Sequence, residues 1–226
     1  MTPGDVPMGT HESDETGALE PLLRRAAAGD EQAAGILFAR YRERLKQMVR
    51  LRLDRRLQGR IDPSDVLQDA YLEVASRIRA YAQSPPLPVF LWLRSLVGQK
   101  LVDLARHHLG TKMRNVGQEV SLYRGAMPQA SSASLAAHLL GRMTSPSMAA
   151  ARAEMQVRIQ EALNGMEPID REILTLRHFE MLTNSETAQV LGLSKAAASN
   201  RYIRALKRLK ETLESTPGHG AFPGRP

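Results

Sequence analysis

The sequence predicts an all-α fold, with two helical domains joined by a flexible linker and a helix-turn-helix in the second domain. Apolar residues recur three and four positions apart along two long segments, which is the spacing of helices with one buried face. Aromatic residues make up only 4% of the 226 residues, which is poor for a β-sandwich, while helix-favouring Ala, Leu, Arg, Glu and Met recur throughout. With 42% hydrophobic residues, the chain has enough apolar material for one or two cores.

The chain contains no cysteine, and its charge is divided unevenly. The absence of cysteine excludes disulfides, thiolate zinc sites and cysteine nucleophiles, and it is typical of a reducing, cytosolic setting. All 31 Lys and Arg residues lie beyond residue 20 with 19 of the 24 acids, so this part has a net charge of +12, whereas residues 1–20 carry −5. So basic a fold predicts a polyanionic partner such as nucleic acid, although charge alone is equally consistent with a soluble basic protein.

The first domain is predicted over residues 19–108. The preceding residues 1–18 are rich in Pro, Gly and acids and lack hydrophobic periodicity, so they are expected to form a disordered acidic arm. From Leu19 the pattern becomes helical, and one long helix must bury an apolar face. The apolar residues of that face, three or four apart, are Leu37, Tyr41, Leu45, Met48 and Leu53.

Two more helices are predicted in the first domain. One begins at an N-cap, Asp62, followed by Pro63 at the first helical position and by an acid, Asp65, three residues after the cap. The other follows the loop SPPLP and is expected over residues 89–107, again with one apolar side. Three helices joined by short connections predict a compact bundle.

A linker and a smaller domain complete the predicted organisation. Residues 109–149 gain Gly, Ser and Pro and lose periodicity, apart from one short helix expected near Ala133–Gly141. Helical patterning returns over residues 150–214, which we predict as the second domain. Residues 215–226 are expected to form a loose tail.

The strongest local signal is the segment TNSETAQVLGLSKAAASNRYIRALKRLK, which spans residues 183–210. Thr183 and Glu186 are spaced as a capping box, and Gly192 is expected to end a short helix in the left-handed conformation. Ser194 then caps the next helix after a turn of about three residues. This pattern is typical of a helix-turn-helix.

The second helix of this motif is predicted to bind DNA. From Lys195 to Lys210 it carries six basic residues and no acidic residue, which suits insertion between two phosphate strands. Asn200 and Arg201 are expected at base edges, and Lys207 and Lys210 at phosphates. A basic surface helix in any pair of antiparallel helices is the competing interpretation.

An acidic ridge runs along the helix that begins after Asp62. Asp65, Asp69 and Glu73 recur every four residues, with Gln68 beside them, away from the apolar stripe. An acid in a first turn is explained by the helix dipole, but the two later acids lie beyond that turn. On a basic protein the ridge predicts a basic protein partner, while acid–base chemistry or magnesium binding by a carboxylate pair is the alternative.

No constellation of residues points to catalysis. A phosphate-binding loop and a histidine cluster are missing, and His107 and His108 diverge on one helix, which is poor geometry for one metal ion. We therefore predict that the chain is not an enzyme and takes no metal or cofactor. Neither a signal peptide nor an apolar run of bilayer length is present, so a cytoplasmic location without membrane contact is expected.

In this order, the motifs resemble the extracytoplasmic-function (ECF) group of bacterial sigma factors, which are RNA polymerase initiation subunits with two helical domains and a linker. The segments GDEQAAGILFARYRERL, DPSDVLQDAYLEV and FLWLRSLVGQKLVDLAR resemble the opening, core-binding and promoter-melting helices of the sigma two domain. The segment MEPIDREILTLRHFEMLTNSETAQVLGLSKAAASNRYIRALKRL is similar to the sigma four domain. The resemblance covers about residues 22–214, and the alanine-rich recognition helix resembles planctomycete-type members.

The resemblance implies core polymerase binding, promoter recognition, melting and initiation, and it assigns the candidate residues to these tasks. Contacts to the clamp helices of the polymerase's largest subunit fall to Asp65, Gln68, Asp69 and Glu73. Contacts to the melted minus-ten strand fall to Trp92, Gln99, Lys100, Asp103 and Arg106. Contacts to the minus-thirty-five duplex fall to Ser194, Lys195, Ala197, Ser199, Asn200, Arg201, Arg204 and Lys207.

Further implications concern partners and departures from the family pattern. Ile173, Leu176 and Phe179 are expected inside the second domain or against the polymerase flap, and an anti-sigma factor is a further candidate partner. Gln99 stands where the family usually has an asparagine near the pocket for a flipped base. Without the resemblance, the single Trp92 is more readily explained as a core residue.

A helix-turn-helix repressor or activator, whose first domain senses a ligand or dimerises, is the alternative function. It predicts a stable dimer and a palindromic operator. A sigma factor predicts a monomer with weak DNA affinity until core polymerase is bound. An enzyme is a third option, and the missing catalytic constellation argues against it.

Overall fold

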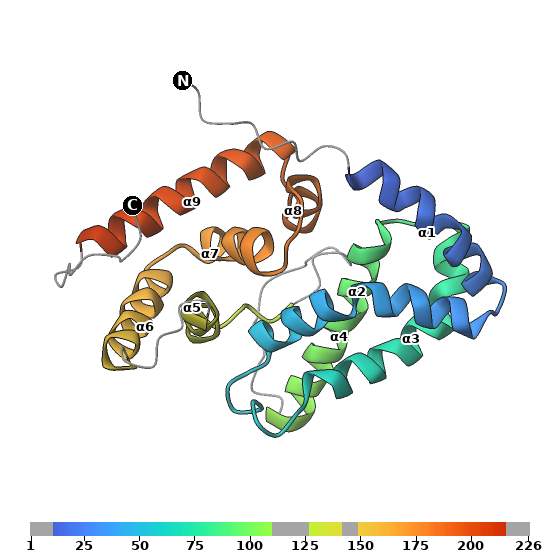
Figure 1. Cartoon of the computed structure of the whole chain (residues 1–226), viewed down its shortest axis with the longest axis horizontal. Helices are drawn as coiled ribbons and strands as arrows, with labels where there is room; N and C mark the ends of the chain where they lie inside the picture. The colour runs from blue at the N-terminus through green and yellow to red at the C-terminus, as the bar shows by residue number, and fades with distance from the viewer. Residues whose placement is uncertain (1–10, 110–126, 142–148, 216–226) are drawn as a thin grey trace.

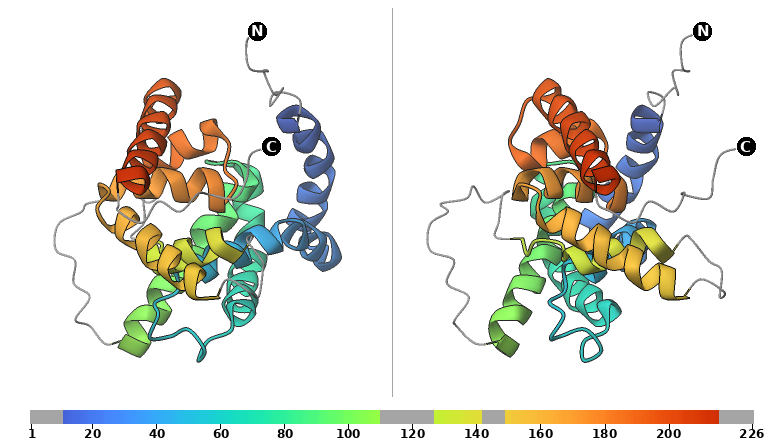
Figure 2. Two further views of the ribbon diagram at one scale, coloured as in Figure 1. Left: turned by 60° about the vertical axis from the view of Figure 1, so that its left-hand side comes forward. Right: turned by 90° about the vertical axis from the view of Figure 1, so that its left-hand side faces the viewer.

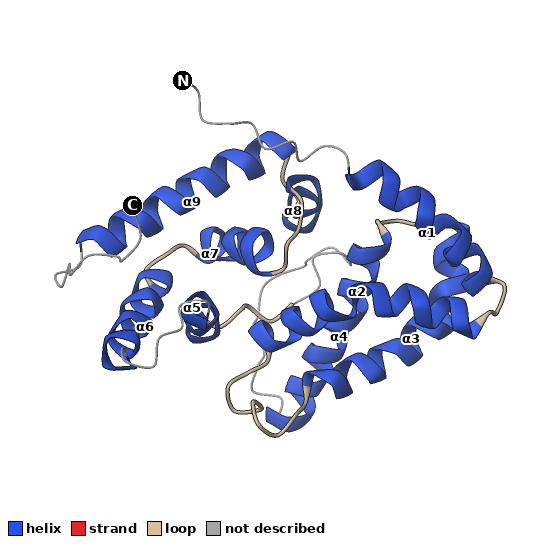
Figure 3. Ribbon diagram, viewed as in Figure 1, coloured by secondary structure: helices blue, strands red, loops and turns tan. Residues whose placement is uncertain are grey.

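The structure is a computed structural model that describes residues 11–109, 127–141 and 149–215. Within these ranges every regular element is a helix, which confirms the predicted all-α fold (Figure 3). Helices α1–α4 form one group and the later helices form another (Figure 1). The elements are α1 (His11–Ala27), α2 (Glu31–Arg52), α3 (Pro63–Gln83), α4 (Val89–Leu109), α5 (Ser132–Gly141), α6 (Ala149–Asn164), α7 (Pro168–Leu174), the π-helical turn η2 (Thr175–Phe179), α8 (Asn184–Leu191) and α9 (Lys195–Ser215).

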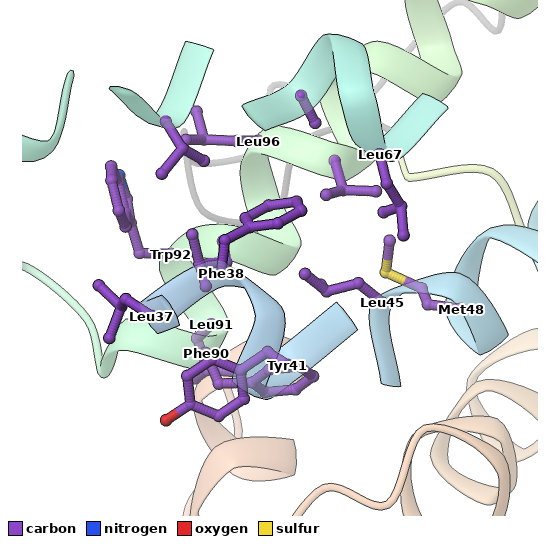
Figure 4. Packing of buried hydrophobic residues seen from close by; sticks show 14 of the residues in the cluster. Leu37, Phe38, Tyr41, Leu45, Met48, Leu67, Phe90, Leu91, Trp92 and Leu96 are labelled. Atoms are coloured by element: carbon purple, nitrogen blue, oxygen red, sulfur yellow. The ribbon is translucent and has the colours of Figure 1, made fainter. Parts of the chain in front are cut away.

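The first group is organised by N-caps and apolar stripes. The Asp30 carboxylate accepts the backbone N–H of Ala33 at 2.9 Å and begins α2. Asp62 accepts the N–H of Ser64 at 2.6 Å and begins α3, as the sequence predicts. The stripes of α2, α3 and α4 then pack together into one core (Figure 4). Its labelled members in Figure 4 are Leu37, Phe38, Tyr41, Leu45, Met48, Leu67, Phe90, Leu91, Trp92 and Leu96.

Helix α1 begins earlier than the sequence predicts. It starts at His11, so residues 11–18 of the predicted disordered arm are helical, whereas residues 1–10 lie outside the described residues. From Leu19 onward the helix contributes buried apolar residues to the first core. The polar segment before Leu19 has no apolar periodicity, and a helix extended from a packed segment leaves no such signal.

The predicted linker over residues 109–149 also needs correction. Residues 110–126 and 142–148 lie outside the described residues, but the short helix expected near Ala133–Gly141 is present as α5. Leu135, Ala136 and Leu140 are buried, and α5 packs along α6. Helix α5 is therefore part of the second core and does not act as a spacer.

The second core lies under the helix-turn-helix. Helices α5, α6, α7 and α9 surround the buried residues Leu163, Ile173 and Phe179, and α8 adds Ala188. Ile173 and Phe179 are therefore buried inside the second domain, which is one of the two positions expected for them. In both views of Figure 2, α9 lies at the outer edge of this group, away from α3.

The two groups of helices are in direct contact. Leu51 of α2 belongs to the second core, while Leu176 and Leu182 belong to the first. The buried Glu180, which follows η2, forms ion pairs with arginines of α2 and α4. Burial opposes ionisation of Glu180, but the attraction of those arginines outweighs it and lowers the pKa of the carboxyl below its usual value. The two groups of helices therefore pack against each other in this structure.

Candidate nucleic-acid interface

Local capping interactions build the helix-turn-helix. Thr183 Oγ1 accepts the N–H of Glu186 at 3.2 Å, and Glu186 Oε2 accepts the N–H of Thr183 at 2.8 Å, which confirms the predicted capping box. Gly192 ends α8 at φ 62° and ψ 38°, a left-handed conformation that favours glycine. Ser194 Oγ accepts the N–H of Ala197 at 3.1 Å at the start of α9. The turn between α8 and α9 is therefore fixed by its own residues.

The outer face of α9 is open and basic. Among the described residues, Lys195 and Arg204 form no ion pair, and Lys207 pairs only with Glu211, at 3.8 Å on the exposed surface. Such an exposed pair contributes little, so the lysine is available to a phosphate. Ser199 is half-buried; the predicted contacts that lie exposed are Ser194, Lys195, Ala197, Asn200, Arg204 and Lys207.

Arg201 occupies a different face of α9. Its Nη1 donates to Asp170 Oδ1 at 2.7 Å, and Nη1 of Arg208 donates to the other oxygen of the same carboxylate at 2.9 Å. Asp170 lies on α7 and is 3% exposed. The sequence places Arg201 at base edges, whereas the structure engages its guanidinium in an ion pair between α9 and α7.

The helical period explains the position of Arg201. Ala198 and Ala205, both fully buried, lie three or four residues from Arg201 and Arg208, so all four share the packed face of α9. Hydrogen bonds from Arg208 and Arg201 also lower the pKa of Glu167, which stands at the start of α7. Of the six basic residues of α9, Arg201 and Arg208 therefore form a structural pair, and the other four face outward.

The acidic ridge of α3 is free of intramolecular partners over most of its length. Asp65, Gln68 and Asp69 are exposed, and none of them forms an ion pair or side-chain hydrogen bond with a described residue. Leu72, one turn further along, is 68% exposed. Sequence reasoning missed Leu72, although its position outside the apolar stripe of α3 could have revealed it. A negatively charged surface with an exposed leucine is suited to a protein partner.

Glu73 behaves differently from the other acids of the ridge. It forms ion pairs with Arg77 on its own helix and with Lys100 of α4, the latter at 3.8 Å. Two residues that the sequence assigns to different partners, Glu73 to the polymerase and Lys100 to DNA, thus face each other. Both are partly exposed, so a partner can still exchange these contacts.

Trp92 belongs to the first core. It is 8% exposed, and its indole stacks on the ring of Tyr81 with the centroids 4.1 Å apart and the planes 14° from parallel. Tyr81 Oη in turn donates to the carbonyl of Leu87 at 2.8 Å, in the loop between α3 and α4. Burial raises the pKa of Tyr81 to about 12, so the hydroxyl keeps the proton that it donates. Trp92 is placed to hold this loop, and its ring is not displayed as a platform for a base.

The remaining candidates on α4 lie on its exposed side. The Gln99 side chain forms no hydrogen bond with any described residue. Asp103 and Arg106, one turn apart, form an exposed ion pair at 3.8 Å. The end of α4 therefore presents an amide and a weakly paired arginine to a ligand, next to the Lys100 side chain.

Both halves of the chain match known proteins of one family. The family model for sigma-70, region 4, matches residues 156–209, from within α6 to within α9. The ECF RNA polymerase sigma factor ShbA of Streptomyces griseus is 29% identical over 204 residues, which cover 89% of this chain and 98% of that protein. The chain is similar to ECF sigma factors over most of its length.

Other relatives match the chain over similar lengths. RNA polymerase sigma factor NccH of Alcaligenes xylosoxydans is 27% identical over 199 residues, 87% of this chain and 95% of that protein. The solved structure of CnrH, in complex with the cytosolic domain of CnrY, has a TM-score of 0.51 and 25% sequence identity, and covers 87% of this chain and 97% of that one. The likeness therefore includes α1–α4 as well as the helix-turn-helix.

Two further observations concern other kinds of site. None of the described helices combines the length and hydrophobicity of a membrane span. Across residues 11–109, 127–141 and 149–215, no three His, Asp or Glu side chains are grouped to hold a metal ion.

The packing of Trp92 leads to a stability prediction. Trp92→Ala removes a buried aromatic side chain from the first core and should lower the free energy of unfolding by about 3–5 kcal/mol. Urea unfolding followed by circular dichroism measures this, because the substitution removes the only tryptophan fluorophore. Trp92→Phe is the matched control and should lose much less. Equal stability of Trp92→Ala and the unsubstituted chain would contradict the core assignment.

Proposed function

We propose that this chain binds core RNA polymerase and directs promoter recognition, melting and transcription initiation. The proposal rests on the positions of two oppositely charged helix surfaces. Helices α9 and α3 lie at opposite edges of the same chain (Figures 1 and 2). The basic residues Lys195, Arg204 and Lys207 of α9 and the acids Asp65 and Asp69 of α3 are exposed. A basic helix in a helix-turn-helix suits duplex DNA, while an acidic ridge repels DNA and suits a basic protein surface.

The proposed contacts divide by surface. The ridge formed by Asp65, Gln68 and Asp69 binds the clamp helices of the largest polymerase subunit, and Glu73 joins it once its intramolecular pairs are exchanged. On α4, Gln99 lies near a flipped base, and the melted strand runs past Lys100, Asp103 and Arg106. Through α9, the chain reads the minus-thirty-five duplex with Ser194, Lys195, Ala197, Ser199, Asn200, Arg204 and Lys207.

Arg204 tests the DNA-binding face of α9. Arg204→Ala should weaken binding to a minus-thirty-five duplex about equally for all sequences, and it should reduce the slope of log affinity against log salt by about one, as expected for a lost phosphate contact. Arg60→Ala removes the same charge from the exposed loop between α2 and α3 and serves as the control. Fluorescence anisotropy at several salt concentrations gives both slopes. An unchanged slope for Arg204→Ala would remove this residue from the interface.

The oligomeric state separates this function from that of a repressor or activator that acts without polymerase. Size-exclusion chromatography with light scattering should give a monomer that co-elutes with core polymerase. A gel shift without polymerase should show weak duplex binding that core polymerase strengthens. A stable dimer with tight, polymerase-independent binding to a palindrome would favour the alternative.

The proposed function also places the chain in the cell. A subunit of RNA polymerase acts in the cytoplasm, and as an initiation factor it carries out no chemistry of its own. CnrH has been solved with the cytosolic domain of a second protein, CnrY. We extend this to the present chain by proposing an anti-sigma factor that masks its polymerase-binding surfaces.

A further inference from the structure

The side chain of Tyr202 on α9 is held by the π-helical turn η2. Its Oη lies 2.7 Å from Nε2 of His178, and the two atoms share a hydrogen bond. The two rings also lie against each other, with their centroids 5.4 Å apart. The guanidinium of Arg177 lies 5.3 Å from the centre of the Tyr202 ring, within the range of a cation–π interaction. Two consecutive residues of η2 therefore hold one side chain of α9.

The imidazole of His178 is neutral near pH 7. Partial burial, and then the positive charge of Arg177, lower the pKa of His178 below its usual value. A neutral imidazole has one donor and one acceptor nitrogen, and a tyrosine hydroxyl can serve as either partner. The hydrogen bond between Tyr202 and His178 therefore forms without a charge on either ring.

The turn η2 also contacts the entry to α8. Nη1 of Arg177 donates to the carbonyl of Leu182 at 2.8 Å, directly before the capping box that begins at Thr183. The same arginine thus touches Tyr202 on one side and the start of α8 on the other. The position of α9 relative to α8 depends on this turn as well as on the residues between the two helices.

Helix α9 is attached to the rest of the second group from two directions. On one side, Arg201 and Arg208 pair with Asp170 of α7. Tyr202 follows Arg201 by one residue, so it lies about 100° further round the helix, where η2 contacts it. Polar contacts on one side alone would leave α9 able to turn about its axis. Contacts about 100° apart restrict that rotation.

The rotation of α9 determines where Asn200 points. Asn200 precedes Tyr202 by two residues, so it lies about 200° round the helix, on nearly the opposite side. It is exposed, and its side chain forms no hydrogen bond with a described residue. A hydrogen bond from such an amide to a base edge weakens steeply when its angle changes. Contacts between basic side chains and phosphates depend mainly on charge and tolerate a small rotation.

We propose that the hydrogen bond between Tyr202 and His178 is a positioning contact, which sets the rotation of α9 and thereby the sequence preference of duplex binding. This inference rests on the proposed function, in which α9 reads the minus-thirty-five duplex. Tyr202 and His178 act through the orientation of Asn200 and do not touch DNA themselves. Loss of the contact therefore reduces discrimination between sequences more than it reduces affinity for duplex DNA in general.

Duplex discrimination tests the positioning role. A minus-thirty-five duplex is first selected from random sequences by the chain bound to core polymerase, and a scrambled duplex of equal composition is the reference. Fluorescence anisotropy with the free chain at low salt then gives the ratio of the two affinities. Tyr202→Phe keeps the ring and removes the hydroxyl. It should lower this ratio at least about fivefold, while the affinity for the scrambled duplex stays within about twofold.

Two control variants separate positioning from stability. Tyr71→Phe removes a hydroxyl of α3 that lies 3.4 Å from the carbonyl of Glu31, and Ile159→Val removes one carbon atom from the second core. Ile159→Val should destabilise the second group to an extent similar to the loss of one hydrogen bond. Both controls should leave the affinity ratio unchanged. An equal fall of the ratio in Ile159→Val would show that stability, and not positioning, accounts for the effect of Tyr202→Phe.

A double-mutant cycle shows whether the two side chains act together. His178→Phe should reproduce the effect of Tyr202→Phe, and the combined variant should lose no more than either alone, because both substitutions break one contact. Losses that add in the combined variant, or an unchanged ratio for Tyr202→Phe, would overturn the positioning role while leaving the proposed function intact. If the unsubstituted chain itself does not prefer the selected duplex, the proposed reading of the minus-thirty-five element fails, and this inference fails with it.

Discussion

Asp65→Lys combined with Asp69→Lys should reduce the affinity for core polymerase at least about 100-fold. Both carboxylates are exposed and unpaired among the described residues, so the substitutions cost the isolated chain little. Opposite a basic partner they create like-charge contacts, which cost several kcal/mol. Surface plasmon resonance with immobilised core polymerase measures the loss.

The control for this prediction changes charge by the same amount elsewhere. Glu154→Lys with Glu161→Lys replaces two exposed acids of α6. This control variant, whose net charge changes by the same four units, should retain core binding, and both double variants should bind a minus-thirty-five duplex at least as well as the unsubstituted chain. Equal loss of polymerase and duplex binding in the α3 variant would refute the division of surfaces.

Asp170→Ala should destabilise the second core by about 2–4 kcal/mol and weaken duplex binding at least about tenfold. The substitution leaves Arg201 and Arg208 without the buried carboxylate that fixes α9 on α7. Thermal unfolding and fluorescence anisotropy give the two quantities.

Glu167→Gln is the matched control for Asp170. Glu167 receives the same two arginines at 3.4 Å but is exposed, so its loss should be much smaller. If Asp170→Ala binds duplex normally while Arg201→Ala abolishes sequence preference, Arg201 acts on DNA and not in the Asp170 pair.

Local signals in the sequence were sufficient to predict most helix boundaries. Asp62 with Pro63, the Thr183–Glu186 box and Gly192 each act over a few residues, and the structure has each of them in the predicted conformation. Such short-range interactions depend on neighbours in the chain and need no knowledge of the fold. The helix-turn-helix followed from them.

The sequence patterns could not show contacts between residues that are distant in the chain. A charged residue is ordinarily expected at the surface, but Arg52, Arg94 and Glu180 bury one another across 86 to 128 positions. Arg201, predicted at base edges, pairs with Asp170 in the structure, and the buried Ala198 and Ala205 mark the packed face on which it lies. For Trp92, the residue type favoured the core and only the family resemblance favoured the minus-ten strand; the structure has it in the first core.

Run-off transcription with purified components tests the central claim most directly. The chain is added to sigma-free core polymerase with a pool of genomic fragments, and transcripts are mapped at their 5′ ends. The proposed function predicts transcripts that depend on the added chain and begin downstream of a shared two-part sequence element. Absence of chain-dependent transcripts from every fragment, with core polymerase shown to be active with another sigma factor, would contradict it.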